Sequence, residues 1–283
     1  MSFSRVGSMI EIFYAALLIP LALVFEGVRR RLVARMHNRV GPPLLQPFYD
    51  IMKLFSKETT PRKNIVFNLV PYLALLCSLA MILIVPFSVL GFDYDFIVLG
   101  YIFILQDTFY IFGAVASRSP FGMLASVREL LLMLGYEITF LIVLALFFHS
   151  TGLLGFQEYN AELAFTKLPF ASLFLLFTAF VILRITPYDV MIAEPEISAG
   201  FFSEYSGRSL ALLEIAEFIK DLVIYLLLGF LIVGKAYALL LAPLFMLFYM
   251  VMLTSSPRYS TVVTVKTFLF LALLAFADIF ILV

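Results

Sequence analysis

Ionisable side chains lie inside stretches of the sequence that are otherwise apolar. Five of them stand well within such stretches: Asp107, Glu137, Glu217, Lys220 and Asp221. Each charge would cost about 2.5–3.5 kcal/mol at the centre of a bilayer. Five unrelieved charges would therefore cost roughly 15 kcal/mol, which equals the stability of a whole domain. These groups must be paired, neutral or hydrated.

Three of the acids share one helical face. Glu214, Glu217 and Asp221 follow one another at spacings of three and four residues, and Lys220 lies three residues after Glu217. This spacing predicts a ladder of carboxylates and an ion pair between Glu217 and Lys220. If Asp107 and Glu137 face the ladder, protons have a continuous path. The alternative is a structural ion pair among inert, protonated acids; we favour the path because ionisable residues inside membrane spans are usually functional.

A second concentration of acids lies in the segment 187–208. Asp189, Glu194, Glu196 and Glu204 occur there among prolines and glycines. One interpretation is a solvated acidic loop. The other is a hinged segment whose carboxylates respond to a nearby charge. Beside a redox centre, an added electron raises the pKa of a carboxylate, because a like charge disfavours ionisation.

The composition identifies the environment of these acids. Hydrophobic residues make up 63% of the 283 residues and charged residues 13%, which excludes a soluble enzyme and a disordered chain. A formal net charge of zero gives no argument for nucleic-acid binding. Continuous apolar runs of about 20 residues predict membrane-spanning helices rather than a barrel. Eight such runs occur, at about 8–28, 65–91, 95–116, 126–150, 169–187, 209–233, 236–254 and 262–282.

The fold class predicted is therefore all-α, a polytopic membrane protein with about eight transmembrane helices in one integral membrane domain spanning residues 1–283. We expect the first run to be a retained helix, since it lacks a charged leader and a small-residue cleavage site. Fifteen Lys and Arg residues fall in the odd-numbered loops and three on the other side. The positive-inside rule then places the odd loops in the cytoplasm and both termini outside.

The first odd loop contains an amphipathic pattern. In the segment 43–58 the apolar residues fall on one helical face and the charged residues on the other. This pattern predicts a cytoplasmic helix lying in the membrane interface. It is either a surface anchor alone or part of a docking surface. The apolar face consists of Leu44, Leu45, Phe48, Ile51, Met52 and Phe55, and the polar face of Asp50, Lys53 and Lys57.

Resident cofactors are not expected. The single cysteine, Cys77, cannot form an internal disulfide or hold an iron–sulfur cluster, which takes about four cysteines. His37 has no metal-ligand neighbour, and no zinc spacing, phosphate-binding loop or nucleophile elbow occurs in the sequence. We therefore predict no metal site and no catalytic residue in this chain.

Four motifs together resemble a known family. RVGPPLLQPFYDIMKLFSKE (39–58) and AEPEISAGFFSEYSG (193–207) are similar to the signature and the acidic loop of the quinone-chamber membrane subunit of respiratory complex I. GYEIT (135–139) and IAEF (215–218) match two further family motifs, and the eight-helix pattern agrees. The resemblance covers nearly the whole chain.

Departures from the complex I pattern favour one branch of the family. The insert usual before LLQP is missing, and ASRSPFGMLASVREL (116–130) resembles membrane-bound nickel–iron hydrogenases and their sulfur-reducing relatives. An expected loop acid is Ile192, Arg184 is offset by one residue, and Arg29 replaces a glutamate, with Glu26 one turn earlier. These changes argue against a standard quinone site and leave the glutamate path intact.

The resemblance implies a subunit of an ion-pumping oxidoreductase that docks a soluble electron-transfer arm and couples redox chemistry to proton or sodium transport. The iron–sulfur clusters and the nickel–iron or equivalent site would lie in soluble partner chains, and antiporter-like membrane subunits would be the other partners. It assigns an ion path to Asp107, Glu137, Glu214, Glu217, Lys220 and Asp221; a coupling loop to Asp189, Glu194, Glu196, Glu204, Tyr205 and Arg208; and a docking surface to Arg29, Arg35, Arg39, Gln46, Asp50, Lys53, Arg118 and Arg128.

Three alternatives stay open at this point. A quinone-binding subunit of an NADH- or deazaflavin-dependent dehydrogenase is the nearest. A free-standing ion-coupled transporter would also need intramembrane acids, although inverted repeats and broken helices, which are typical of transporters, do not occur here. A lipid-embedded scaffold predicts that replacing the acids changes little.

Overall fold

The computed structural model describes residues 2–59, 63–85, 95–151, 169–189, 200–234 and 238–275. These ranges are helical and contain no strand. The helices are α1 (Ser2–Met36), α2 (Gln46–Ser56), α3 (Ile65–Ile84), α4 (Asp95–Ala116), α5 (Pro120–Thr151), α7 (Pro169–Ile182), the short 3-10 helix η1 (Phe202–Glu204), α9 (Gly207–Val233), α10 (Ala238–Ser255) and α11 (Thr261–Ala275).

Each of the eight predicted spans contains a helix, which confirms the all-α membrane fold. Four helices, α3, α4, α5 and α10, are long and apolar enough to cross a membrane, and α7 and α11 are shorter apolar helices. Helix α1 continues to Met36, beyond the apolar run predicted at about 8–28. Glu26 pairs with Arg29 and Arg30 at spacings of three and four residues, and such pairs stabilise a polar helical extension.

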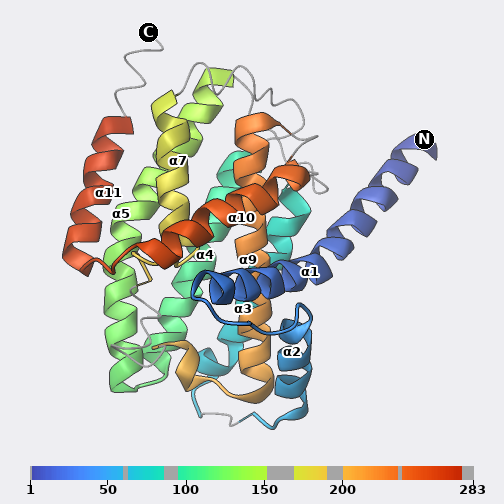
Figure 1. Ribbon diagram of the computed structural model, residues 1–283, viewed down its shortest axis with the longest axis vertical. Coiled ribbons are helices and arrows are strands. Elements are labelled where there is room, and N and C mark those ends of the chain that lie inside the picture. Colours follow the sequence, from blue (N-terminus) through green and yellow to red (C-terminus); the bar gives the residue numbers. More distant parts are fainter. Residues whose placement is uncertain are drawn as a thin grey trace.

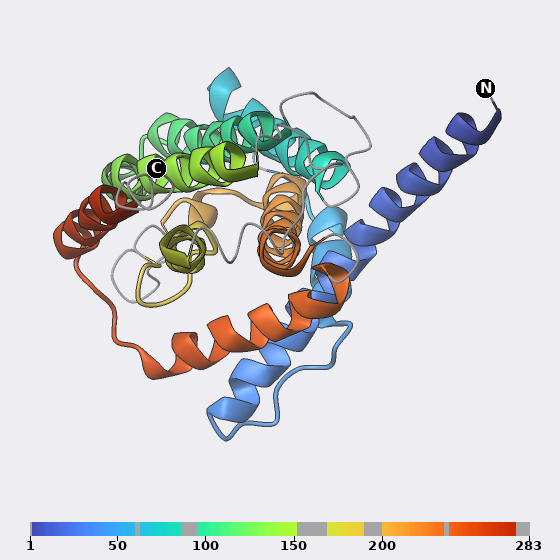
Figure 2. The same cartoon turned by 90° about the horizontal axis from the view of Figure 1, so that it is seen from above.

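Helix α9 is the centre of the bundle. It contacts α1, α2, α3, α7 and α10. Seen from above, α7 and α9 lie between a curved row of α11, α5, α4 and α3 on one side and the steeply tilted α1 and α10 on the other (Figure 2). The residues from Leu222 to Leu231 of α9 are all buried. A helix that is apolar on every side belongs in a core, so any charge on α9 must meet a partner from a neighbouring helix.

The amphipathic segment forms α2, two or three residues shorter at each end than predicted. It packs on α9 and α1 and runs alongside the lower part of α9 (Figure 1). Pro47 and Ile51 are buried there, whereas Tyr49 and Met52 are exposed. The exposed apolar residues leave a surface that suits lipid contact, and the interfacial position of α2 stays a prediction.

The residues before α9 are held against α3 and α4 by aromatic packing. The ring of Tyr205 stacks on Phe67 at 4.1 Å between centroids, and its hydroxyl donates a hydrogen bond of 3.1 Å to the Phe67 carbonyl oxygen. Phe201 is fully buried beside Tyr205 and Tyr110. The end of the predicted coupling loop is therefore fixed to the bundle.

Gly207, the first residue of α9, packs against the backbone that follows α2. We expect Gly207→Ala to destabilise the protein. Its φ is +54°, and a Cβ there would lie 2.5 Å from the Glu58 carbonyl oxygen. The left-handed backbone and the backbone clash together should cost at least about 2 kcal/mol. The matched control is Gly100→Ala, whose Cβ would meet only the flexible ends of Leu141 and Leu144. Thermal unfolding of the two variants should differ, and equal midpoints would contradict this packing.

Candidate functional site

A cluster of buried charges joins α4, α5, α9 and the turn after α7. Asp107 is its centre, with a side chain 2% exposed. Its Oδ1 accepts hydrogen bonds from Lys220 at 2.5 Å and from Arg184 at 2.8 Å, and its Oδ2 accepts one of 2.8 Å from the Tyr136 hydroxyl. Asp107 is thus held by two cations and a phenol.

Arg184 connects Asp107 to two further acids. Its Nη1 donates to Glu217 at 2.6 Å, and its Nη2 also donates to Glu129 at 3.1 Å. The guanidinium lies 4.8 Å from the ring centre of Tyr110. One arginine therefore binds carboxylates from three helices, which suits its planar fork of donors.

The local backbone explains how Arg184 reaches this position. Helix α7 ends at Ile182, and Arg184 takes a left-handed conformation with φ +48° while its amide donates to the Val181 carbonyl at 2.9 Å. This turn directs the side chain into the bundle, where it is 4% exposed. A non-glycine residue with positive φ is uncommon and costs free energy, which the ion pairs of Arg184 offset.

The cluster has more carboxyl groups than cations. Asp107, Glu129 and Glu217 bind the two cations Arg184 and Lys220, and Glu137 is buried on α5 two helical turns after Glu129. Four acids thus face two cations. Unpaired buried charge is costly, so neutrality requires that some of these carboxyl groups hold protons.

Several buried polar atoms of the cluster have no hydrogen-bond partner among the residues that the structure describes. They are Gln106 Oε1, Glu137 Oε1, Glu217 Oε2 and Arg184 Nε. Buried polar groups are usually satisfied, so these atoms mark positions where a proton or an ordered water is needed. Gln106 lies on α4, Glu137 on α5 and Glu217 on α9, and Arg184 follows α7. These atoms therefore surround the ion pairs of Asp107 and Arg184.

A second polar cluster lies where α1 meets α2 and α9. Both Arg29 and Arg30 donate to Glu26, the latter at 2.8 Å, and Arg30 also donates to Asp50 of α2 at 2.8 Å. Gln46 donates to Asp50 at 2.9 Å. This cluster ties α1 to α2 through hydrogen-bonded ion pairs.

A small cavity separates the second cluster from α9. Glu26, Arg29, Asp221 and Tyr225 line it, together with apolar residues, and its volume of about 10 Å³ lies at the lower limit for a cavity that holds one water molecule. Within the described part of the chain, Asp221 Oδ1 and the Tyr225 hydroxyl have no hydrogen-bond partner. Asp221 therefore faces α1, one turn beyond Glu217.

The predicted ion pair between Glu217 and Lys220 is wrong. Lys220 binds Asp107 of α4, and Glu217 binds Arg184. Residues three apart on a helix can pair, as Glu26 and Arg29 do, but Lys220 and Glu217 each bind a partner outside α9. Asp107 faces α9, because it accepts a hydrogen bond from Lys220.

Several members of the two clusters were not predicted as site residues, among them Glu26, Arg30, Glu129, Tyr136 and Arg184. One signal was available for Arg184, because carboxyl groups in excess of the single spanning cation, Lys220, favour a further cation, and Arg184 lies near the end of the fifth predicted span. Glu129 precedes Glu137 by eight residues, close to two full helical turns, which puts both on one face.

The predicted coupling-loop residues occupy separate positions. Asp189 forms an ion pair with Arg258 at 2.7 Å, Glu204 accepts a short hydrogen bond from Ser119, and Arg208 donates to the Phe55 carbonyl at 3.4 Å. Tyr205 is buried on Phe67. Glu194 and Glu196 lie outside the described residues.

The predicted docking residues divide into two groups. Arg35, Arg39, Lys53 and Arg118 are exposed, and Arg128 is half-buried. Arg29, Gln46 and Asp50 instead belong to the hydrogen-bonded cluster of α1 and α2. Glu214 is half-buried on α9 and interacts electrostatically with Arg30 and Asp50.

No group of three or more histidine, cysteine or carboxylate residues in the described ranges is arranged to hold a metal ion.

The chain resembles membrane subunits of several redox complexes. The model of the family described as NADH dehydrogenase matches residues 9–283. Hydrogenase-4 component C of Escherichia coli (strain K12) is 32% identical over 223 residues, which cover 74% of this chain and 70% of the relative. Formate hydrogenlyase subunit 4 of the same organism is 29% identical over 224 residues, which cover 74% and 72%.

A solved structure shares the fold. A chain of the membrane-bound sulfane sulfur reductase, an archaeal respiratory membrane complex, superposes with a TM-score of 0.85 at 20% sequence identity. The match covers 98% of this chain and 99% of that chain. The two chains therefore share the same arrangement of helices.

We expect Asp107→Asn to destabilise the protein strongly, because it leaves the buried ammonium of Lys220 without its acid. Breaking a buried pair in this way costs about 3–5 kcal/mol. Thermal unfolding of the detergent-solubilised protein would measure the loss. Adding Lys220→Met to the same chain should recover most of it, because the unpaired cation is removed. A double variant as unstable as Asp107→Asn alone would show that the pair does not hold the cluster together.

Proposed function

The chain belongs to the NADH dehydrogenase family, and we propose that it couples redox chemistry to ion translocation as a membrane subunit of a complex-I-like oxidoreductase. The relatives named above favour the membrane-bound hydrogenase or sulfur-reducing branch. The observation that carries the proposal is the line of ionisable side chains across the bundle. It begins at Glu137, passes through the Asp107 and Arg184 cluster to Glu217 and Asp221, and ends at Glu26 and Asp50.

The excess of carboxyl groups makes this line suitable for moving protons. Arg184 and Arg30 are each shared between acids, so a proton added to one carboxyl group releases the cation toward another. Arg184 is the clearest case, because Asp107, Glu129 and Glu217 compete for its two terminal nitrogens. Protonation of Glu217 would let Arg184 bind the other two acids more closely. A charge change at one end of the line would then reach the other end.

The segment between α7 and α9 would connect this line to the redox partner. Arg184 stands at its start within the buried cluster, and Asp189 follows five residues later, at the surface beside Arg258. At its other end, Glu204 and Tyr205 are bound to Ser119 and Phe67. An electron arriving near the loop favours proton uptake by its carboxyl groups, Glu194 and Glu196 among them. A shift of the loop would move Arg184 directly, because the two are continuous in the chain.

Docking of the soluble arm is assigned to the basic surface of α1 and α2. Arg35 and Arg39 at the end of α1 and Lys53 of α2 are exposed and carry positive charge. We propose that this surface faces the cytoplasm, that both termini lie outside, and that the arm bound there carries the iron–sulfur clusters and the nickel–iron or equivalent site. Antiporter-like membrane subunits would receive the charge change. The ion moved is a proton or sodium, since carboxylates serve either.

Replacing Glu217 tests the path. In membrane vesicles containing the assembled complex, Glu217→Gln should reduce the ions translocated per electron pair at least about tenfold, because an amide side chain cannot take up and release a proton. Turnover of the soluble arm with an artificial donor should change little. Glu217→Asp, which keeps a carboxyl group, is the matched control and should retain part of the translocation. Normal translocation by the glutamine variant would remove Glu217 from the path.

Charge reversal tests the docking surface. The double variant Arg35→Glu, Arg39→Glu should release the soluble arm at lower salt than the wild type. The reversal replaces attraction at the proposed surface by repulsion, so less screening of the remaining charge pairs is needed to release the arm. Lys266→Glu is the matched control, since Lys266 is exposed on α11, on the far side of the bundle from α2 (Figure 2). Retention of the arm on the tagged membrane subunit at increasing salt is the measurement. Equal release from both variants would contradict the docking assignment.

A further inference from the structure

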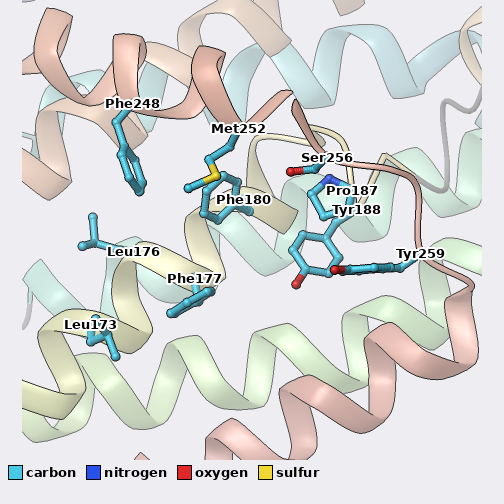
Figure 3. A pocket seen from close by; sticks show the side chains of 10 residues that line it. All are labelled: Leu173, Leu176, Phe177, Phe180, Pro187, Tyr188, Phe248, Met252, Ser256 and Tyr259. Carbon is cyan, nitrogen blue, oxygen red and sulfur yellow. The ribbon is translucent and has the colours of Figure 1, made fainter. Parts of the chain in front are cut away.

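An apolar pocket lies between α7 and α10, separate from both charge clusters. Its volume is about 260 Å³. Leu173, Leu176, Phe177 and Phe180 of α7 form one wall, and Phe248 and Met252 of α10 form the other (Figure 3). The ring of Phe180 also packs against the ring of Tyr249 in a T-shaped contact, with 4.5 Å between centroids.

The polar groups of the pocket gather at one end. Tyr188, Ser256 and Tyr259 supply the lining hydroxyl groups, and Figure 3 shows them together with Pro187, away from Leu173 and Phe248. The Tyr259 amide donates to the Pro187 carbonyl at 3.1 Å, so the two loops that form this end are joined. A ligand that matches this lining is a hydrocarbon chain with hydrogen-bond acceptors at one end.

The charges next to this end are already neutralised. Arg258 donates to both oxygens of Asp189 at 2.7–3.0 Å, so the pair presents little net charge to a ligand. Recognition at this end would therefore rest on hydroxyl groups donating to neutral acceptors such as ester carbonyl oxygens. An amphipathic tyrosine is also the residue typical of the boundary between lipid tails and head groups.

The position and size of the pocket indicate that the hydrocarbon chain would come from a membrane lipid. Phe177 and Phe248 line the pocket and are also exposed on the flank of the bundle, and α10 is one of the four clear membrane-spanning helices. The pocket exceeds the roughly 150 Å³ of an apolar cavity that takes benzene, and is smaller than the roughly 300 Å³ where sites for drug-sized ligands begin. This volume suits a segment of one hydrocarbon chain and is too small for a substituted ring with its tail.

We infer that the groove between α7 and α10 binds one acyl chain of a membrane phospholipid, with the glycerol ester region at Tyr188, Ser256 and Tyr259. The bound chain would pack on Pro187 and Tyr188, three and four residues after Arg184. It would thus support the segment that carries Arg184 into the charge cluster.

Native mass spectrometry of the assembled complex, purified in mild detergent and then delipidated stepwise, tests this inference. The wild type should retain one phospholipid that Met252→Trp loses, because the larger ring fills the pocket. At matched delipidation, retention should fall about tenfold, equivalent to roughly 1.4 kcal/mol. Leu240→Trp is the control, since Leu240 lies on the same helix outside the pocket and is 73% exposed.

A second variant separates loss of the lipid from misfolding caused by the larger side chain of Met252→Trp. Tyr259→Phe removes only a hydroxyl group at the polar end and should weaken retention of the same phospholipid in a complex of normal subunit composition. Equal phospholipid retention by the wild type and both pocket variants would overturn the inference. Retention of an isoprenoid quinone in place of the phospholipid would overturn it as well.

Discussion

Ionised side chains within a membrane-spanning bundle are stable only when partners from other helices share their charge, and this requirement governs the packing around α9. Lys220 and Glu217 lie on a helix that is mainly apolar, and each binds a partner from another part of the bundle. The partners come from α4 and from the turn after α7. The hydrogen bonds of Arg184 to three acids therefore fix the relative positions of α4, α5, α7 and α9.

The same requirement gives the bundle a means of transmitting charge. Cations shared among more acids than they can neutralise have alternative arrangements of similar energy, whereas isolated pairs have one. Such a group surrounds Arg184. In the second cluster Arg30 is shared between Glu26 and Asp50, and Asp221 lines a small cavity next to it. In this view the stability of the bundle and its proposed coupling role depend on the same side chains.

The helices and the presence of buried acids were predictable from the sequence, because hydrophobic run length and the 3.6-residue period are local properties. The family resemblance carried by the four motifs is confirmed by the match over residues 9–283. Pairings across helices were not predictable. The left-handed turn at Arg184 and the bond of Lys220 to Asp107 depend on how α7 and α4 pack on α9, which no local pattern specifies. The bond of Asp50 to α1 was likewise invisible, since the two partners are 20 residues apart.

The central claim is that buried carboxyl groups of this subunit change protonation when the redox partner is reduced. Infrared difference spectroscopy of the assembled complex, recorded between the oxidised and reduced states, measures the carbonyl stretch of protonated carboxyl groups directly. We predict a band in this region that is lost in Glu137→Gln, a variant with intact subunit composition. An identical band in the wild type and in variants at Glu137 and Glu217 would contradict the claim.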